Sequence, residues 1–202
     1  MIIMIMSMAP VGNFEMKVSR DQMAENRSRI LDVASKLFRE KGFDAVSVSE
    51  VMKAAGLTHG GFYGHFASKD DLVAETIRYV LSHDGSESVD LRTYLDEYLA
   101  PKHRDNAADG CPTAGLASDI RHQTPAARAA MTAGLRSQVD RLEAALPDID
   151  EADRRRAAIG TWAAMVGAMI IARAIDDTTL SDEVLGETRA WIEAALGAAT
   201  KH

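Results

Sequence analysis

The chain contains a single cysteine, Cys111, and its position favours a reactive thiol. Pro112 follows it directly, and proline is common at the first position of a helix, so Cys111 is expected at a helix N-terminus. His103 and Arg104 stand in the preceding segment. A positive helix end and nearby cationic or titratable side chains both favour the thiolate, the form of cysteine that reacts. The alternative is a small apolar residue buried at a helix start, which is the role that most free cysteines have and the one we favour for Cys111.

No other residues have the spacing of a catalytic or metal site. Cys111, His103 and His122 form only a weak constellation, and no Ser/His/Asp or metal-ligand pattern is present. A lone cysteine excludes an internal disulfide and a multi-cysteine zinc site, and it fits a reducing cytosol. We therefore expect a cytoplasmic protein with no enzymatic activity, no metal and no cofactor, and keep a small all-α enzyme as an alternative.

Residues 47–69 read SVSEVMKAAGLTHGGFYGHFASK and predict two short helices joined by a tight turn. Ser47 and Glu50 form a capping box at the start of the first helix. Gly56 ends this helix in the left-handed conformation that other residues avoid. Thr58 is expected to cap a second helix that runs to Phe66.

The second helix contains three glycines, Gly60, Gly61 and Gly64. Each costs about 1 kcal/mol relative to alanine in a helix interior. Such a cost is tolerated where a backbone must come close to a partner. Two helices joined by a short glycine turn are typical of the helix-turn-helix, whose second helix enters the major groove of DNA.

The composition indicates an all-α protein of about nine helices. Strand-like runs at period two are absent, and alanine is abundant. The net charge is −7, but residues 1–83 contain equal numbers of basic and acidic residues, so residues 84–202 carry the whole excess. The acidic part should face away from DNA. No apolar run reaches the roughly 18 residues that a membrane helix needs, so no membrane partner is expected.

The chain is expected to have three parts. Residues 1–23 form a disordered tail or an overlong start, residues 24–83 form the DNA-binding domain with its connecting helix, and residues 84–202 form a second helical domain. The polar segment 84–88 marks the boundary between the two domains. Further helices are expected from about Val89, Cys111, Thr124, Asp150 and Ser181, with a polar loop over 101–110.

The segment ILDVASKLFREKGFDAVSVSEVMKAAGLTHGGFYGHFASKDDL, together with the count of nine helices, resembles the TetR family of bacterial repressors. Several features coincide with the N-terminal DNA-binding domain of that family, which we call the head and which corresponds to residues 24–83 here. They are the Gly42-Phe43 stop, the Ala55-Gly56-Leu57 turn, the Phe62-Tyr63 pair, His65-Phe66 and Ser68-Lys69. The GCP motif at 110–112 looks like one branch of the family. The resemblance implies a dimeric repressor of double-stranded DNA with a near-palindromic operator, released by an unknown small-molecule effector.

The resemblance places phosphate contacts at Thr58 and Tyr63, with His65 and Lys69 nearby. Hydroxyls and lysine are common phosphate partners. The full set of expected DNA-contacting residues is Arg27, Ser47, Thr58, His59, Gly60, Gly61, Tyr63, His65 and Lys69. Phe62 and Phe66 are expected in the core. Many relatives carry Lys where His59 stands and Thr where Gly61 stands, so the operator cannot be borrowed from a relative. An adaptor that has lost DNA binding through these two departures is a further alternative.

The family also implies an effector pocket and pairing of the last two helices with a second subunit. Small residues recur over 157–172, and apolar residues recur over 184–196, which suits a four-helix seam between subunits. An ordinary intramolecular core is the alternative. The residues expected to line the pocket are Cys111, Met131, Leu135, Trp162, Met165 and Met169, although a methionine stripe of this kind also suits plain core.

Overall fold

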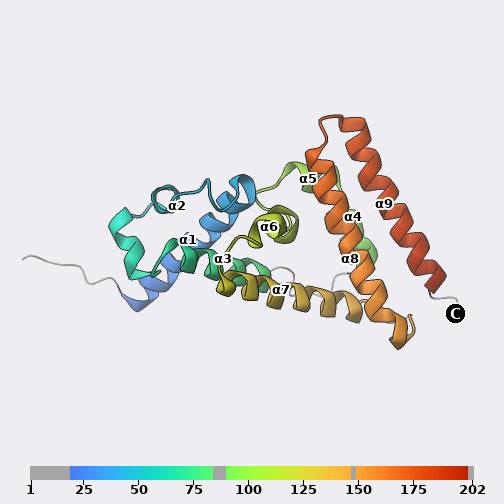
Figure 1. Cartoon of the computed structure of the whole chain (residues 1–202), viewed down its shortest axis with the longest axis horizontal. Coiled ribbons are helices and arrows are strands. Elements are labelled where there is room, and N and C mark those ends of the chain that lie inside the picture. Colours follow the sequence, from blue (N-terminus) through green and yellow to red (C-terminus); the bar gives the residue numbers. More distant parts are fainter. Residues whose placement is uncertain (1–18, 84–89, 147–148, 200–202) are drawn as a thin grey trace, which may run out of the picture.

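A computed structural model of the chain describes residues 19–83, 90–146 and 149–199. Within these ranges every regular element is helical, which confirms the all-α class (Figure 1). The elements are α1 (Arg20–Lys41), α2 (Val48–Ala54), the 3₁₀ helix η1 (His59–Gly64), α3 (Lys69–His83), α4 (Leu91–Tyr98), α5 (Pro101–Asp105), α6 (Pro112–Ile120), α7 (Pro125–Ala144), α8 (Glu151–Ala174) and α9 (Thr178–Ala199). Residues 1–18 of the expected tail and the expected boundary at 84–88 lie outside the described residues, whereas residues 20–23 of that tail form the first turn of α1.

Helix α1 begins earlier than the sequence suggested, at Arg20 rather than near residue 24. The hydroxyl of Ser19 accepts a hydrogen bond from the backbone N–H of Gln22 at 3.1 Å and caps the helix. The helix ends at Gly42, whose φ of +78° is accessible to glycine and whose N–H donates to the carbonyl of Phe38 at 2.8 Å. Phe43 then turns back into the core, 5.2 Å from the Phe38 ring.

The turn after α2 forms as expected, but the element that follows it differs. Ser47 accepts a hydrogen bond from the N–H of Glu50 at 3.1 Å, and Gly56 has a φ of +70°. Residues 59–64 then form a 3₁₀ helix rather than an α-helix, and Thr58 makes no side-chain cap. The backbone N–H of Gly61 bonds to the carbonyl of Thr58, three residues back, at 3.0 Å. Three glycines in six residues weaken the α-helical preference enough for this tighter geometry.

The core of the head continues into the second part of the chain. Phe62 and Phe66 are buried and stack at 5.7 Å, as expected for core residues. The same apolar cluster includes Leu116 of α6 and Met131 of α7. Helix α7 approaches α3 closely at Gly134, where an added Cβ would come within 2.6 Å of the Cβ of Leu81. The head is therefore packed directly on α6 and α7.

Helices α8 and α9 lie side by side at the end of the molecule away from the head (Figure 1). Helix α9 begins at Thr178, earlier than expected, because the carboxylate of Asp177 accepts from the N–H groups of Thr179 and Leu180. Ser181, expected to open this helix, is instead buried, and its hydroxyl donates to the carbonyl of Ala172 at 2.8 Å.

Two other sequence expectations need correction. The segment expected as a polar loop over 101–110 contains the short helix α5, which Pro101 begins in the first helical position. Helix α8 is long and apolar enough, by length and composition alone, to cross a membrane, whereas no such segment was expected. The core helices of soluble proteins meet the same criterion, and one face of α8 is buried against the rest of the protein.

Candidate DNA interface and effector site

The turn and η1 present a polar, mostly uncharged surface. Tyr63 is 71 % exposed, and its ring rests edge-on against the buried Phe62 ring at 5.3 Å. The other residues predicted to contact DNA from this surface are also exposed: Ser47, Thr58, His59, Gly60 and Gly61. The buried Phe62 thus holds the neighbouring tyrosine outward, where its hydroxyl can meet a partner.

Lys69 stands at the first position of α3, beside this surface. Its ammonium lies 3.5 Å from the carbonyl oxygen of Asp44, and Ser68 caps the helix by accepting from the N–H of Asp71 at 3.1 Å. The backbone N–H groups of a helix start and an adjacent ammonium together suit an anion such as phosphate.

Arg27 differs from the other predicted DNA contacts because its guanidinium interacts with residues of the head itself. It pairs with Glu75 at 2.7 Å and lies over the Phe66 ring, 4.5 Å from its centroid. The nearby His65 is partly buried, and this burial, followed by the charge of Arg27, lowers its pKa below the usual value. His65 is therefore neutral at pH 7, and Arg27 positions the end of the reading element.

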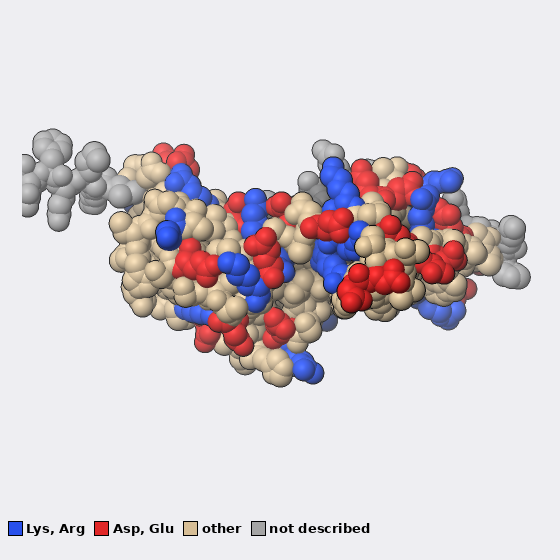
Figure 2. Space-filling model, turned by 90° about the horizontal axis from the view of Figure 1, so that it is seen from above, with Lys and Arg blue, Asp and Glu red and all other residues tan. Residues whose placement is uncertain are grey.

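Acidic side chains are dense over the C-terminal half on the face seen in Figure 2. The head, on the left, shows mostly uncharged surface on that face with a few residues of each sign. At the end of α1, Lys41 is paired with Glu50 at 2.7 Å, while Lys53 of α2 is exposed. This distribution agrees with the charge asymmetry along the chain.

A hollow of about 340 Å³ lies where α1 and α3 meet α4 and the α5–α6 connection. Its lining includes three tyrosines, two cations of α1 and the only cysteine: Tyr79, Tyr94, Tyr98, Lys36, Arg39 and Cys111. The sequence predicted only Cys111 among these. Tyr94 and Tyr98 are one helical turn apart on α4 in a chain with four tyrosines, a spacing that could have drawn attention to them.

Cys111 precedes α6 as expected, but its surroundings differ from the cationic ones predicted. Its backbone N–H donates to Nε2 of His103 at 2.9 Å, and Nδ1 of His103 lies 2.7 Å from the carbonyl of Tyr98. Because Nε2 accepts a hydrogen bond, the proton must be on Nδ1 and the imidazole is neutral. Arg104 points away, and its guanidinium bonds to the Ser181 hydroxyl at 2.8 Å.

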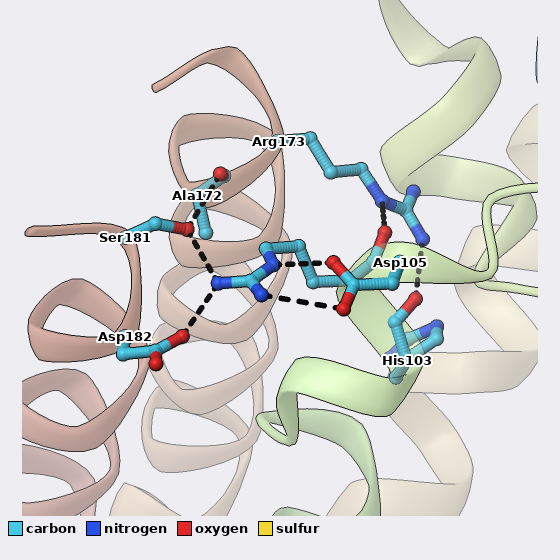
Figure 3. A network of polar contacts seen from close by, with 7 residues as sticks. His103, Asp105, Ala172, Arg173, Ser181 and Asp182 are labelled. Atoms are coloured by element: carbon cyan, nitrogen blue, oxygen red, sulfur yellow. Dashed lines mark hydrogen bonds and ion pairs between the residues drawn. The ribbon is translucent and has the colours of Figure 1, made fainter. Parts of the chain in front are cut away.

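A cation that the sequence did not place near Cys111 is Arg173 of α8. Its guanidinium donates to the carbonyls of His103 at 2.9 Å and Arg104 at 3.1 Å, which end α5 (Figure 3). It lies close enough to Cys111 that a thiolate there would raise the pKa of Arg173, against the lowering caused by burial. Gly110 makes room for it, since an added Cβ would lie 2.5 Å from Nη2 of Arg173.

The α5–α6 connection is also attached to the head. Nη1 of Arg39 donates to the carbonyl of Gly110 at 2.9 Å. The ammonium of Lys36 lies 3.3 Å from the carboxylate of Asp109. Both cations belong to α1, so residues 109–111 are held between α1 on one side and α8 on the other.

The other residues predicted to line a pocket are not brought together. Met131 and Leu135 pack in the cluster that fills the head. Met165 and Met169 are fully buried in a second cluster between α4, α8 and α9, with Trp162 at its margin. None of these five lines the hollow beside Cys111. The methionines of α8 lie in a core cluster, and their role in an effector pocket stays a prediction.

One face of α8 and α9 remains apolar and exposed in the single chain. Trp191 is 60 % exposed, and the other large apolar side chains exposed here are Ile159, Ile170, Ile171 and Leu180. An added Cβ at Gly167 would meet nothing within 4 Å. This surface has the character of one that a partner covers. In the described residues no group of three or more His, Cys, Asp or Glu could hold a metal.

Comparison with known proteins identifies the head. Residues 30–76 match the family described as bacterial regulatory proteins, tetR family. The chain is 44 % identical over 57 residues to the HTH-type transcriptional regulator AcrR of Shigella flexneri, and 42 % identical over 52 residues to the HTH-type transcriptional repressor KstR2 of Rhodococcus jostii. Each match covers 26 % of the relative, and 28 % and 26 % of this chain respectively. The chain therefore matches only about a quarter of the length of these relatives.

The fold extends the likeness beyond the head. A TetR-family transcriptional regulator from Agrobacterium tumefaciens superimposes with a TM-score of 0.67 at 25 % identity, over 85 % of this chain and 98 % of that one. The reduced form of E. coli NemR superimposes with a TM-score of 0.64 at 21 % identity, over 84 % and 96 %. The helix-turn-helix part is therefore that of the TetR family of bacterial regulatory proteins, and the fold of the described residues is that of a TetR-family regulator.

Proposed function

We propose that the protein is a cytoplasmic, dimeric repressor that binds a near-palindromic operator in double-stranded DNA and is released by a small effector. The observation that carries this proposal is the exposed Tyr63, held outward by a buried Phe62 on the second element of a helix-turn-helix. In this proposal residues 24–83 form the DNA-binding domain and residues 84–202 the effector and dimerisation domain.

Phosphate contacts are proposed for Tyr63, Thr58 and Lys69. Their hydroxyls and ammonium lie on or beside one polar surface, and Thr58 and Tyr63 are exposed. In the described part of the chain Lys69 has only the long 3.5 Å contact with the carbonyl of Asp44 to lose on binding. Ser47, His59, Gly60 and Gly61 complete the surface, where the glycines let the backbone come close to DNA. His65 lies at its margin. Arg27 is better assigned to holding Phe66 than to DNA, because its guanidinium already pairs with Glu75.

A second copy of the chain is proposed to cover the apolar face of α8 and α9. A dimer related by a two-fold axis would present two heads, with half-sites roughly 34–36 Å apart on one face of the DNA. This spacing is why a near-palindromic operator is expected. The exposed Trp191 and the open space at Gly167 support this face as the contact.

The effector is proposed to act at the hollow beside Cys111, through non-covalent binding or through modification of the thiol. Supporting this site, the hollow is bounded by α1 of the head, and residues 109–110 are bonded directly to Lys36 and Arg39. A ligand that displaces these residues would shift α1. A change of about 1.4 kcal/mol between two states alters their ratio tenfold.

The decisive test is binding to a duplex from the region upstream of the protein's own gene, measured by fluorescence anisotropy at several salt concentrations. If that duplex fails, duplexes selected from a random pool replace it. We expect tight binding that weakens steeply with salt. Absence of binding to every selected duplex would favour an adaptor without DNA binding, and a measurable turnover would favour an enzyme. Cys111→Ser should bind DNA normally. If it still responds to the effector, the effector acts without modifying the thiol.

A further inference from the structure

A second hollow, larger than the one beside Cys111, opens at the end of the molecule away from the head (Figure 1). It lies between the start of α4, the end of α7 and the end of α9. Its volume is about 440 Å³, within the range of small-molecule sites. Large aliphatic side chains form much of its lining: Leu91, Leu95, Leu146, Ile149 and Leu196. None of the residues predicted to line an effector pocket belongs to it.

This hollow follows the seam between two separate apolar clusters of the C-terminal half. Leu95 belongs to the cluster between α4, α8 and α9, whereas Leu146 and Ile149 belong to the cluster between α7 and α8. Leu91 and Leu196 pack against both clusters. Among the described residues, α4 makes no extensive close approach to α7 or α9, so its side chains do not close the seam. An apolar body placed in the hollow would join the two clusters and remove their facing surfaces from water.

Polar contacts of the chain itself hold the walls of this hollow in place. The guanidinium of Arg154 donates to the carbonyl of Ile149 at 3.0 and 3.2 Å, which fixes the turn between α7 and α8. Arg189 of α9 forms an ion pair with Asp96 of α4, so these two walls are also joined. A ligand would therefore meet a largely formed site and lose little affinity to ordering of the protein.

The proposed dimer would leave this hollow open. Glu193, Leu196 and Gly197 line it from α9, and their spacing of three and four residues puts them on one side of that helix. Trp191 and Leu180, which belong to the exposed apolar face, are eleven residues apart, or about three turns, and lie on the opposite side of α9. The hollow is thus separate from the face that a second copy is proposed to cover.

We propose that this hollow binds a small aliphatic amine, with its hydrocarbon body against the leucines and its ammonium at the rim beside Asp90 and Glu193. The charged groups of the lining are these two carboxylates and one guanidinium, Arg92. Residues 84–202, which form the hollow, also carry the whole excess of negative charge, and this excess attracts a cation. Asp90 already caps α4, accepting from the N–H of Thr93 at 3.1 Å, so an anion at this helix start would meet its carboxylate. The inference does not depend on the proposed DNA binding.

Isothermal titration calorimetry on the full-length protein would test both parts of the proposal with three probes that share one alkyl chain. The probes are octylamine, octan-1-ol and octanoate, which carry a positive, a neutral and a negative head at pH 7. We expect octylamine to bind about three- to fivefold tighter than octan-1-ol, the modest gain that partly exposed ion pairs give. Octanoate should bind more weakly than the alcohol.

Two sets of variants locate the site. Ala145→Phe places a ring in the hollow and should weaken octylamine binding about tenfold or more, whereas the matched control Ala144→Phe, exposed and outside the lining, should change it less than about twofold. Asp90→Asn, which keeps the helix cap, combined with Glu193→Gln should reduce the preference for the amine over the alcohol to less than about twofold. Glu97→Gln, exposed on α4 but outside the lining, should leave that preference unchanged.

Three outcomes would overturn the proposal. They are no binding of octylamine by the wild type, equal weakening by Ala145→Phe and Ala144→Phe, and tighter binding of octanoate than of octylamine. These titrations contain no DNA, so they are independent of the operator experiment. A protein that binds octylamine in the hollow but binds no duplex would contradict the proposed function and leave this site. A protein that binds DNA but not octylamine would contradict this site alone.

Discussion

The buried hydroxyl of Tyr98 leads to a stability prediction of unusual sign. Most substitutions of buried residues destabilise a protein, but Tyr98→Phe should stabilise the unliganded protein. Among the described residues the hydroxyl meets only the Cys111 sulfur, which is a weak acceptor. Its removal therefore relieves part of a desolvation cost of about 1–3 kcal/mol. The ring stays in place, so its packing in the cluster that also contains Leu95 and Met169 is kept.

Tyr94→Phe provides the matched control, because the same single oxygen is removed from the same helix and the same hollow. Here the oxygen accepts from Gln138, a buried residue, and its loss leaves that amide without an acceptor. The free energy of unfolding should therefore fall by about 1–3 kcal/mol. For a chain of this length, 1 kcal/mol corresponds to a shift of about 2–4 °C in the melting temperature.

Thermal and urea unfolding at one fixed protein concentration would measure both variants, since the stability of a dimer depends on concentration. We expect a rise for Tyr98→Phe and a drop for Tyr94→Phe. A loss of more than about 1 kcal/mol in Tyr98→Phe would show that the hydroxyl makes a strong structural hydrogen bond, and it would refute this reasoning.

Three further substitutions test other parts of the molecule. Tyr63→Phe and Lys69→Ala should weaken DNA binding to all sequences alike, and the lysine change should also reduce the slope of affinity against salt by about 1 in anisotropy titrations; a changed base preference would contradict phosphate contact. Gly167→Arg should give a folded monomer by sedimentation with weakened DNA binding, because the added side chain meets nothing within its own subunit; an unchanged dimer would place the interface elsewhere. Arg27→Ala should lower the melting temperature because the ion pair with Glu75 and the contact with Phe66 are lost, yet it should leave the slope of DNA affinity against salt unchanged. A reduced slope would show that Arg27 contacts DNA.

Much of the head could be predicted because its constraints are local. The Ser47 cap, the left-handed Gly56 and the buried Phe62 beside an exposed Tyr63 each depend on residues a few positions apart. The 3₁₀ geometry of 59–64 was missed because α-helical and 3₁₀ turns differ by little in a glycine-rich segment. The glycines of this segment indicated an unusual backbone conformation but did not specify a 3₁₀ helix.

The effector site could not be predicted in the same way because its parts come from distant segments. Arg39 and Gly110 are bonded to each other across 71 positions, and Arg173 reaches His103 across 70. No periodicity in the sequence reports such pairs. The methionines of α8 were expected near the ligand on account of their adaptable side chains, but the same apolar spacing fills a core equally well, and the structure places them there.

The contacts around residues 109–111 suggest how an event at Cys111 could reach DNA. This short segment is bonded to α1 through Arg39 and Lys36, while Arg173 of α8 holds the end of α5 just before it. Helix α1 packs in the same core as η1, and α8 carries the proposed dimer face. A group added at Cys111 would therefore press on the connection between the helix that supports the reading element and the helix that sets the distance between two heads. Interior packing leaves little free volume to absorb such a change, so the displacement must appear as a shift of one helix relative to the other.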